Sequence, residues 1–184
     1  READVVVLVI DAQDGVTDQD KRIVDLSNRE GKGLVLVVNK WDLIPNKTPK
    51  SVDEYKEKLL QKLPHGLFAK LVFTSAASGQ RVTHILKHVC TVHENRLRRV
   101  STSLVNQVIG EAVTLMPPPI IKNKAMKIYY ATQVAAAPPT FLLFANDGKL
   151  MKESYRRYLE RKLRESFEFE GVPLRIVSRT RREN

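Results

Sequence analysis

Two short polar motifs contain the side chains of this sequence that are best placed to bind a small molecule. Asn39-Lys40-Trp41-Asp42 directly follows the apolar run 34–38, and Thr74-Ser75-Ala76-Ala77 directly follows the apolar run 71–73. Parallel α/β sheets bind their ligands outside the carboxyl ends of the strands. If both runs are strands of one parallel sheet, the two motifs lie side by side on its ligand-binding edge.

The first motif has the chemistry needed to recognise guanine. The Asp42 carboxylate can accept hydrogen bonds from the ring N–H and from the exocyclic amino group of guanine, a donor pair that adenine lacks. We expect the Asn39 amide to brace the neighbouring loop. We expect the aliphatic stem of Lys40 to lie along the base.

The second motif can complete a clamp around the base. Ser75 can brace the Asp42 loop, and the backbone N–H of Ala76 can donate to the guanine carbonyl, because the side chains there are small. The predicted base-binding set is Asn39, Lys40, Asp42, Ser75, Ala76 and Ala77. Asn-Lys-x-Asp alone also fits an ordinary strand-to-helix turn, so the prediction depends on the two motifs together.

The residues that hold phosphates and magnesium are missing from these 184 residues. Segment 15–21 follows a strand but lacks the second glycine and the Ser/Thr after lysine of a phosphate-binding loop. No Asp-x-x-Gly stands at a strand end, and the chain opens on Arg1 without an initiator methionine. We expect a fragment whose catalytic and switch elements lie upstream, with no catalytic residue of its own and no hydrolysis by the chain alone.

Alternating strand and helix patterns predict an α/β domain over residues 1–95. Buried strands are expected at 5–10, 34–38 and 71–73, and helices at about 17–29, 51–63 and 82–92. This order implies a parallel sheet with right-handed crossovers. A charged junction at 94–99 marks the boundary to a second domain, 96–184. There the order is α-β-β-α-β, with helices at 101–115 and 153–166 and strands at 127–133, 140–145 and 173–178.

The positive charge of the chain is concentrated in the second domain. The net charge is +10, of which residues 1–95 carry +1 and residues 96–184 carry +9. A one-sided basic surplus is typical of proteins that bind a polyanion such as nucleic acid, although a solvated basic face without a partner fits it too. No apolar run reaches the roughly 20 residues that a bilayer requires. The single cysteine, Cys90, fits a reducing compartment such as the cytosol or an organelle stroma or matrix.

Several longer segments strongly resemble the Der/EngA family of ribosome-associated GTPases. In the first domain these are Val-Ile-Asp-Ala-x-Asp-Gly-Val-Thr-x-Gln-Asp (9–20), Val-Val-Asn-Lys-Trp-Asp (37–42) and Phe-Thr-Ser-Ala-x-x-Gly-Gln-Arg-Val (73–82). In the second domain Arg-Val-Ser-Thr-Ser (99–103), Lys-Ile-Tyr-Tyr-Ala-Thr-Gln (127–133), Pro-Pro-Thr-Phe (138–141), Tyr-Arg-Arg-Tyr-Leu-Glu (155–160) and Glu-Gly-Val-Pro-Leu-Arg (170–175) resemble its KH-like domain.

The resemblance implies the second half of a Ras-like G domain followed by a KH-like domain. In that family two G domains precede the KH-like domain, and the protein supports maturation of the large ribosomal subunit. The implied ligands are GTP and GDP, with Mg²⁺ bound only in the intact parent, which would be the GTPase. The implied partners are the large-subunit precursor with its rRNA and the chain's own upstream G domains, with no membrane. The implied location is the bacterial cytoplasm, or an organelle stroma or matrix.

The second domain lacks the Gly-x-x-Gly loop with which KH domains clamp a nucleic-acid backbone. Candidate RNA contacts are the cations Arg156, Arg157, Arg161, Lys162, Arg164, Arg179, Arg181 and Arg182. In the alternative interpretation Glu153, Glu160 and Glu165 pair with the helical cations on a solvated face. Tyr129, Tyr130, Phe141 and Phe144 can stack on bases, but aromatic residues in strands are more often core.

A third cluster, His84, His88, Cys90 and His93, superficially offers metal ligands. Only the two histidines four residues apart share a helix face, so no metal site is expected. Two other functions remain open for the whole chain. One is a stand-alone RNA-binding protein with a vestigial half G domain, and the other is a KH-like domain that holds its own G domains and contacts no RNA.

Overall fold

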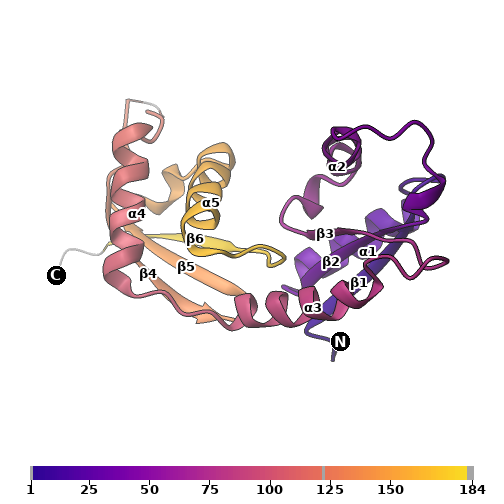
Figure 1. The fold of residues 1–184 in the computed structure, drawn as a ribbon. Coiled ribbons are helices and arrows are strands. Elements are labelled where there is room, and N and C mark those ends of the chain that lie inside the picture. Colours follow the sequence, from indigo (N-terminus) through magenta and orange to yellow (C-terminus); the bar gives the residue numbers. More distant parts are fainter. Residues whose placement is uncertain (1, 122, 182–184) are drawn as a thin grey trace. The chain divides into compact units, whose positions relative to one another are not determined.

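The computed structural model describes residues 2–121 and 123–181 and divides into two compact units (Figure 1). The first unit contains the residues up to Asn95 together with Glu170–Pro173. The second contains Arg96–Phe169 and the residues from Leu174 onward. The first unit therefore includes a four-residue segment, Glu170–Pro173, that the sequence analysis assigned to the second domain.

The first unit is a three-stranded parallel sheet with helices between the strands. In chain order it contains β1 (Val5–Asp11), α1 (Asp18–Arg29), β2 (Gly33–Asn39), η1 (Trp41–Leu43), α2 (Ser51–Lys62), η2 (Pro64–Gly66), β3 (Lys70–Phe73) and α3 (Val82–Leu97). The strand order is β1-β2-β3. The central strand β2 is buried over six consecutive residues, as its continuous apolar run predicts.

Local signals in the sequence explain where α1 begins and why α3 ends later than expected. Thr17 and Asp20 form the predicted capping box at the start of α1. Helix α3 was expected to end near residue 92, and it continues to Leu97. No glycine or proline interrupts residues 83–98, and the charged residues of the junction are good helix formers. The junction is therefore partly the last turn of α3.

The segment Glu170–Pro173 completes the first unit from far away in the sequence. The Leu34 N–H donates to the Gly171 carbonyl at 2.8 Å, and the Gly171 N–H donates to the Phe68 carbonyl at 2.7 Å. The Val172 side chain is fully buried in the apolar cluster on one face of the sheet. Nothing in the local sequence pattern of 170–173 indicated this placement, because it depends on contacts more than 70 residues away.

The second unit has the predicted α-β-β-α-β order. It contains α4 (Thr102–Leu115), β4 (Ile128–Ala136), β5 (Pro139–Ala145), η3 (Gly148–Leu150), α5 (Glu153–Phe167) and β6 (Arg175–Thr180). Strand β5 is central, antiparallel to β4 and parallel to β6. The helices pack on one sheet face around a core that includes Phe141, Leu143, Leu159, Leu163 and Phe169. The mixed α/β fold predicted from the sequence is confirmed.

The four strand aromatics of the second unit divide between the core and the surface. Phe141 is fully buried, as expected for most aromatic residues in strands. Tyr129 and Tyr130 are 44% and 43% exposed, and Phe144 is half-buried. Two adjacent tyrosines can both face solvent because the register of β4 against β5 shifts between Ile128 and Tyr130.

Within the described residues, no helix is both long enough and apolar enough to cross a membrane. The same residues contain no group of three or more His, Cys, Asp or Glu side chains that could hold a metal ion.

Candidate nucleotide-binding site

The three parallel strands of the first unit end at neighbouring positions, and their ends are joined by backbone hydrogen bonds. Asp11 at the end of β1 pairs in register with Asn39 at the end of β2. The Ala12 N–H donates to the Asn39 carbonyl at 2.9 Å, and the Thr74 N–H donates to the Val38 carbonyl at 2.8 Å. The two polar motifs therefore lie on the same edge of the sheet, where parallel α/β sheets bind ligands.

The Asn39 side chain connects the two motifs. Its Oδ1 accepts a hydrogen bond from the Ala76 N–H at 3.0 Å and another from the Thr74 hydroxyl at 3.3 Å. One side-chain oxygen thus fixes both the end of β3 and the turn that follows it. The Ala76 N–H, which the sequence assigned to the guanine carbonyl, has Asn39 as its partner in this structure.

Lys40 occupies a left-handed backbone conformation with φ 59°, directly after β2. Its Nζ lies 2.6 Å from Asp11 Oδ2 at the end of the adjacent strand. The hydrogen bond from Lys40 lowers the pKa of Asp11, and the same contact raises the pKa of Lys40. The ammonium group of Lys40 is therefore held at the end of β1, and its aliphatic stem extends from the end of β2 to that point.

The loop that carries Asp42 is anchored by the residue before it. Trp41 is buried, and its ring makes edge contacts with Tyr55 and Phe73 at centroid distances of 5.3 and 4.6 Å. The Trp41 N–H donates to the Thr74 carbonyl at 3.0 Å. Asp42 itself is exposed, so the anchored loop presents its carboxylate to solvent.

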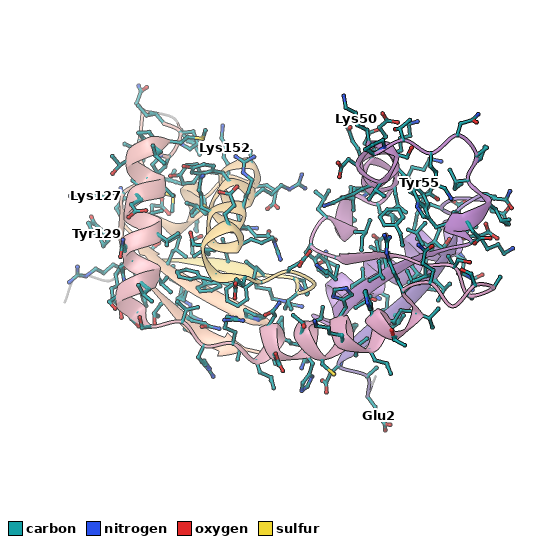
Figure 2. The ribbon with its side chains drawn as sticks, viewed as in Figure 1. Glu2, Lys50, Tyr55, Lys127, Tyr129 and Lys152 are labelled. Carbon is teal, nitrogen blue, oxygen red and sulfur yellow. The ribbon has the colours of Figure 1, made fainter. Side chains whose placement is uncertain are left out.

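Two further side chains support this edge of the sheet. Lys47 Nζ donates to the carbonyl oxygens of Trp41 and Asp42 at 2.9 and 3.2 Å. The Tyr55 hydroxyl, on α2, donates to the Ala12 carbonyl at 3.1 Å (Figure 2). Burial raises the pKa of Tyr55 further above its ordinary value, so the hydroxyl stays protonated over a wider pH range.

Ser75 differs from its predicted role, because it braces its own turn instead of the Asp42 loop. Its Oγ accepts from the Ser78 N–H at 3.3 Å, and its N–H donates to the Gln80 carbonyl at 3.2 Å. Residues 76–79 form a tight turn that brings Ser78 back to Ser75. Thr74 performs the bracing through its hydroxyl and its carbonyl. Ala76 and Ala77 are exposed in that turn.

Sequence reasoning missed the supporting residues Asp11, Trp41, Lys47, Tyr55 and Thr74. Asp11 and Thr74 carried a usable signal, because each is a polar residue at the end of a buried strand. Lys47 and Tyr55 carried none, since their partners are set by how the loop and α2 fold back.

The cations predicted on α5 are paired with carboxylates of the same helix. Arg156 and Arg157 lie 2.7 and 3.5 Å from Glu153. Lys162 and Arg161 lie 3.0 and 3.8 Å from Glu165. These contacts are those of the alternative interpretation, a helix whose charges satisfy one another at three- and four-residue spacing.

Arg164 is the least exposed cation of α5. It lies 2.9 Å from Glu160, and burial lowers its pKa. Arg179 lies in β6 and Arg181 directly after it, both exposed, whereas Arg182 lies outside the described residues. The predicted RNA-contact residues therefore fall into a paired helical group and a group at the end of β6.

Comparison with known proteins identifies both parts of the chain. Residues 1–95 match the model of the elongation factor Tu GTP-binding domain. Residues 99–179 match the model described as the KH-domain-like domain of EngA bacterial GTPase enzymes, C-terminal. The chain belongs to the Der/EngA family of GTPases. The family predicted from the sequence motifs is thereby confirmed.

Curated Der/EngA relatives align along nearly the whole chain. GTPase Der of Moorella thermoacetica is 46% identical over 181 residues, 98% of this chain and 41% of the relative. GTPase Der of Clostridium perfringens is 48% identical, and that of Lactobacillus johnsonii 41%, with the same coverage. The chain thus spans about two fifths of the length of the relatives it matches.

Proposed function

We propose that this chain supplies guanine recognition to a GTPase that binds a precursor of the large ribosomal subunit. The observation that carries the first part is the connection between the two polar motifs. The Asn39 side chain of the first motif accepts hydrogen bonds from Ala76 and Thr74 of the second motif. The Trp41 N–H of the first motif donates to the Thr74 carbonyl. These contacts hold two loops on one sheet edge, and Asp42 remains exposed to solvent there.

The residues of this edge fit the guanine base. The Asp42 carboxylate accepts from the two adjacent N–H donors of guanine, and a charged acceptor makes these bonds stronger than neutral ones. The Lys40 stem provides an apolar strip for one face of the base, since its ammonium group is held by Asp11. The backbone N–H groups of the turn that contains Ala76 and Ala77 supply donors for the guanine carbonyl, with the Ala76 N–H shared with Asn39.

The same edge does not fit the phosphates or Mg²⁺. The start of α1 is the nearest counterpart of a phosphate-binding helix terminus, and there the capping box engages the Asp20 N–H with the Thr17 hydroxyl and the Thr17 N–H with the Asp20 carboxylate. Asp18 and Asp20 add negative charge to that turn, which repels a phosphate. GTP hydrolysis therefore needs residues outside this chain, and Mg²⁺ bound there would stabilise the charge of the transferring phosphate.

The second part of the proposal assigns ribosome docking to the KH-like unit. It is supported by the family match over residues 99–179 and by the net charge of +9 in residues 96–184. A basic surface of this kind neutralises RNA phosphates and releases counterions, which gives affinity that falls as salt rises. The proposed partners are the rRNA of the precursor and the upstream G domains of the same polypeptide, and the proposed location is the cytoplasm.

The Asp42→Asn substitution in the full-length protein tests guanine recognition. An amide at this position loses the charged acceptor for guanine but can donate to the extra oxygen of xanthine. We expect the affinity of this G domain for GTP to fall by about 2–4 kcal/mol. We expect XTP binding to appear with a stoichiometry of one, measured with radiolabelled nucleotides.

A charge-matched control variant makes this experiment decisive. Asp53→Asn, an acidic residue in the first turn of α2, changes the same charge away from the proposed site. It should leave the GTP and XTP affinities unchanged. If Asp42→Asn kept the wild-type preference for GTP over XTP, Asp42 would not read the base.

A further inference from the structure

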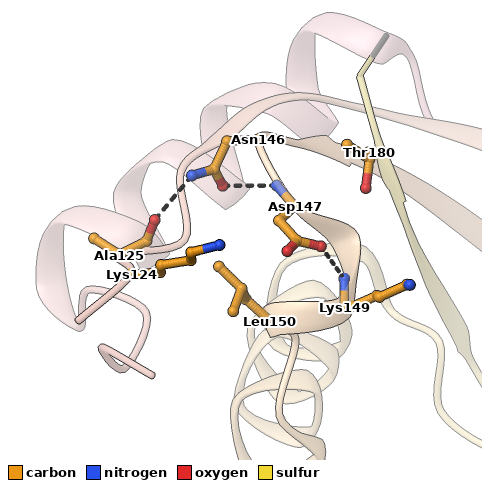
Figure 3. Close-up of a pocket in the computed structure, with 7 residues that line it drawn as sticks. All are labelled: Lys124, Ala125, Asn146, Asp147, Lys149, Leu150 and Thr180. Carbon is orange, nitrogen blue, oxygen red and sulfur yellow. Dashed lines mark hydrogen bonds between the residues drawn. The ribbon is translucent and has the colours of Figure 1, made fainter. Parts of the chain in front are cut away.

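A pocket in the second unit lies at the end of the sheet where β4 begins and where β5 and β6 end (Figure 3). It has a volume of about 600 Å³ and is lined by Lys124, Ala125, Asn146, Asp147, Lys149, Leu150 and Thr180. None of the lining residues is among the RNA contacts predicted from the sequence. The pocket is in the size range of small-ligand sites, so it can admit a phosphate with its sugar.

The frame of the pocket is fixed by hydrogen bonds among its own residues. Asn146 Oδ1 accepts from the N–H groups of Lys127 and Asp147 at 2.8 and 2.9 Å, and its amide donates to Ala125 at 2.9 Å. Asp147 Oδ1 accepts from the Lys149 N–H at 2.9 Å (Figure 3). The Asp147 carboxylate keeps its negative charge when its Oδ1 accepts from a backbone N–H, so the lining offers a ligand two ammonium groups and one carboxylate.

The two lysines reach the pocket from different segments. Lys124 comes from the loop before β4, and Lys149 comes from η3, as Figure 3 shows. Both are exposed, and neither forms an ion pair with a described residue. The η3 segment is held against β6, where the Gly148 N–H donates to Thr180 Oγ1 at 3.0 Å. The backbone at Gly148 approaches so closely that a Cβ there would lie 3.0 Å from Arg179 Cα.

Three more exposed cations stand near the pocket, and two of them flank an exposed tyrosine. Lys127 Nζ and Arg181 Cζ lie 5.5 and 5.8 Å from the centre of the Tyr129 ring. Arg179 stands one residue before the pocket residue Thr180. The described residues at this sheet end thus bring together the cations Lys124, Lys127, Lys149, Arg179 and Arg181. Asp147 is the single acidic residue among those that line the pocket.

Two aromatic side chains and one arginine form a row across the three strands, on the sheet face that carries no helix. Tyr130, Phe144 and Arg179 stand opposite one another on β4, β5 and β6. The rings of Tyr130 and Phe144 lie 6.0 Å apart, and Tyr130 is 43% exposed, while the register shift in β4 falls at Tyr129. Exposed aromatic rings beside a row of cations are the combination with which proteins bind single-stranded nucleic acid.

We infer that this pocket binds a backbone phosphate of single-stranded RNA between Lys124 and Lys149, while the next bases stack on Tyr130 and Tyr129. The choice of RNA rests on the proposed ribosomal function. An acidic protein segment would satisfy the lysines equally but would not use the exposed rings. The assignment moves the main RNA contact from α5, whose cations are paired with carboxylates, to cations of the sheet end that have no ion pair with a described residue.

The test compares two charge reversals of equal size in the full-length protein. Lys124→Glu/Lys149→Glu alters the pocket, and Arg157→Glu/Arg161→Glu alters exposed cations of α5 by the same net charge. Binding of a fluorescein-labelled 12-nucleotide oligouridylate is followed by fluorescence anisotropy between 50 and 300 mM KCl, about the range over which phosphate contacts respond to salt. We expect the pocket variant to lose at least about tenfold in affinity and the α5 variant less than about threefold.

Two further variants separate charge, stacking and folding. Lys124→Gln/Lys149→Gln removes the positive charges without adding negative ones, and it should flatten the salt dependence by about one to two counterions. Tyr130→Leu should weaken oligouridylate binding by about fivefold or more without changing the salt slope, because stacking is not ionic. Thermal melts followed by circular dichroism check that each variant is folded. Equal losses in the pocket and α5 variants, or none in the pocket variant, would overturn the inference.

A sedimentation assay separates failure of the pocket assignment from failure of the proposed ribosome docking. Sedimentation of the wild-type protein with large-subunit precursors tests ribosome docking, and the pocket variant in the same assay tests the pocket. Wild-type sedimentation that the pocket variant retains in full refutes the pocket alone. Pocket-dependent oligouridylate binding without sedimentation refutes ribosome docking alone. Polyglutamate that competes with oligouridylate at equal charge would identify an acidic protein as the occupant and refute the RNA assignment.

Discussion

Two regions of the molecule are rich in polar side chains but differ in the range of their contacts. One is the nucleotide edge, the sheet edge of the first unit that carries residues 39–42 and 74–77, and the other is helix α5 of the second unit. At the nucleotide edge, Asn39 bonds to residues 35 and 37 positions later, and the Tyr55 hydroxyl bonds to a carbonyl 43 positions earlier. On α5, the ion pairs join residues three or four positions apart on an exposed surface. Long-range contacts fix the position of a loop, whereas local pairs support only the helix that carries them.

This difference explains why similar evidence supports different conclusions in the two regions. When one side chain makes the hydrogen bonds that join two distant segments, its replacement removes that connection. An exposed charge on a helix contributes to a summed field and is screened by salt. We therefore expect single substitutions to cost much at the long-range contacts of the first unit and little on α5.

The largest effect is expected at Gly171, where the first unit is closed by a segment from outside its own sequence range. Gly171 has φ +81°, and a Cβ there would lie 2.2 Å from Val92 Cγ2. Gly171→Ala adds backbone strain and a clash, so we expect the free energy of unfolding to fall by about 3 kcal/mol. Urea denaturation of the full-length protein measures this.

A matched glycine separates strain from packing. Gly15 has a similar φ of +76°, but nothing lies within 4 Å of its would-be Cβ. Gly15→Ala should cost only about 1 kcal/mol, the backbone term by itself. Equal losses at both positions would mean that the contact of Gly171 with Val92 contributes nothing.

The second effect concerns the connection between the two polar motifs, Asn39–Asp42 and Thr74–Ala77. Asn39→Ala removes the acceptor of the Ala76 N–H and the Thr74 hydroxyl, so the second loop is no longer fixed. We expect the affinity for guanine nucleotides at this G domain to fall by about 1–3 kcal/mol. Displacement of a fluorescent GDP analogue measures it.

Thr74→Val serves as the control for this prediction, since it removes one donor and keeps the shape of the side chain. It should cost about 1 kcal/mol or less, because the Ala76 N–H keeps its partner in Asn39. A Thr74→Val loss as large as that of Asn39→Ala would show that Thr74, and not the Asn39 amide, holds the loop.

The smallest effect is expected on α5. Glu165→Gln removes the carboxylate that pairs with Arg161 and Lys162, both at an exposed surface. We expect a loss of unfolding free energy of less than about 1 kcal/mol, and less still at high salt. A loss that exceeds this value, measured by thermal denaturation in low and high KCl, would show that the α5 pairs hold the unit together.

Signals in the sequence were enough to predict the family, the mixed α/β fold and the positions of the two polar motifs. These follow from signals within short windows: continuous apolar runs for buried strands, Thr17 with Asp20 for a helix start, and Asn39 to Asp42 directly after a strand. The α-β-β-α-β order of the second unit was also readable, because each element carries its own periodicity.

Only the tertiary structure decided which groups meet. It placed Val172 in the core of the first unit, gave the bracing role to Thr74 instead of Ser75, and assembled the sheet-end pocket from residues 124–125, residues 146–150 and Thr180. It also paired the α5 cations with carboxylates of their own helix. The physical reason is that hydrogen bonds and charges act through space over a few ångströms, so residues distant in sequence interact only where strand register and chain reversal bring them together.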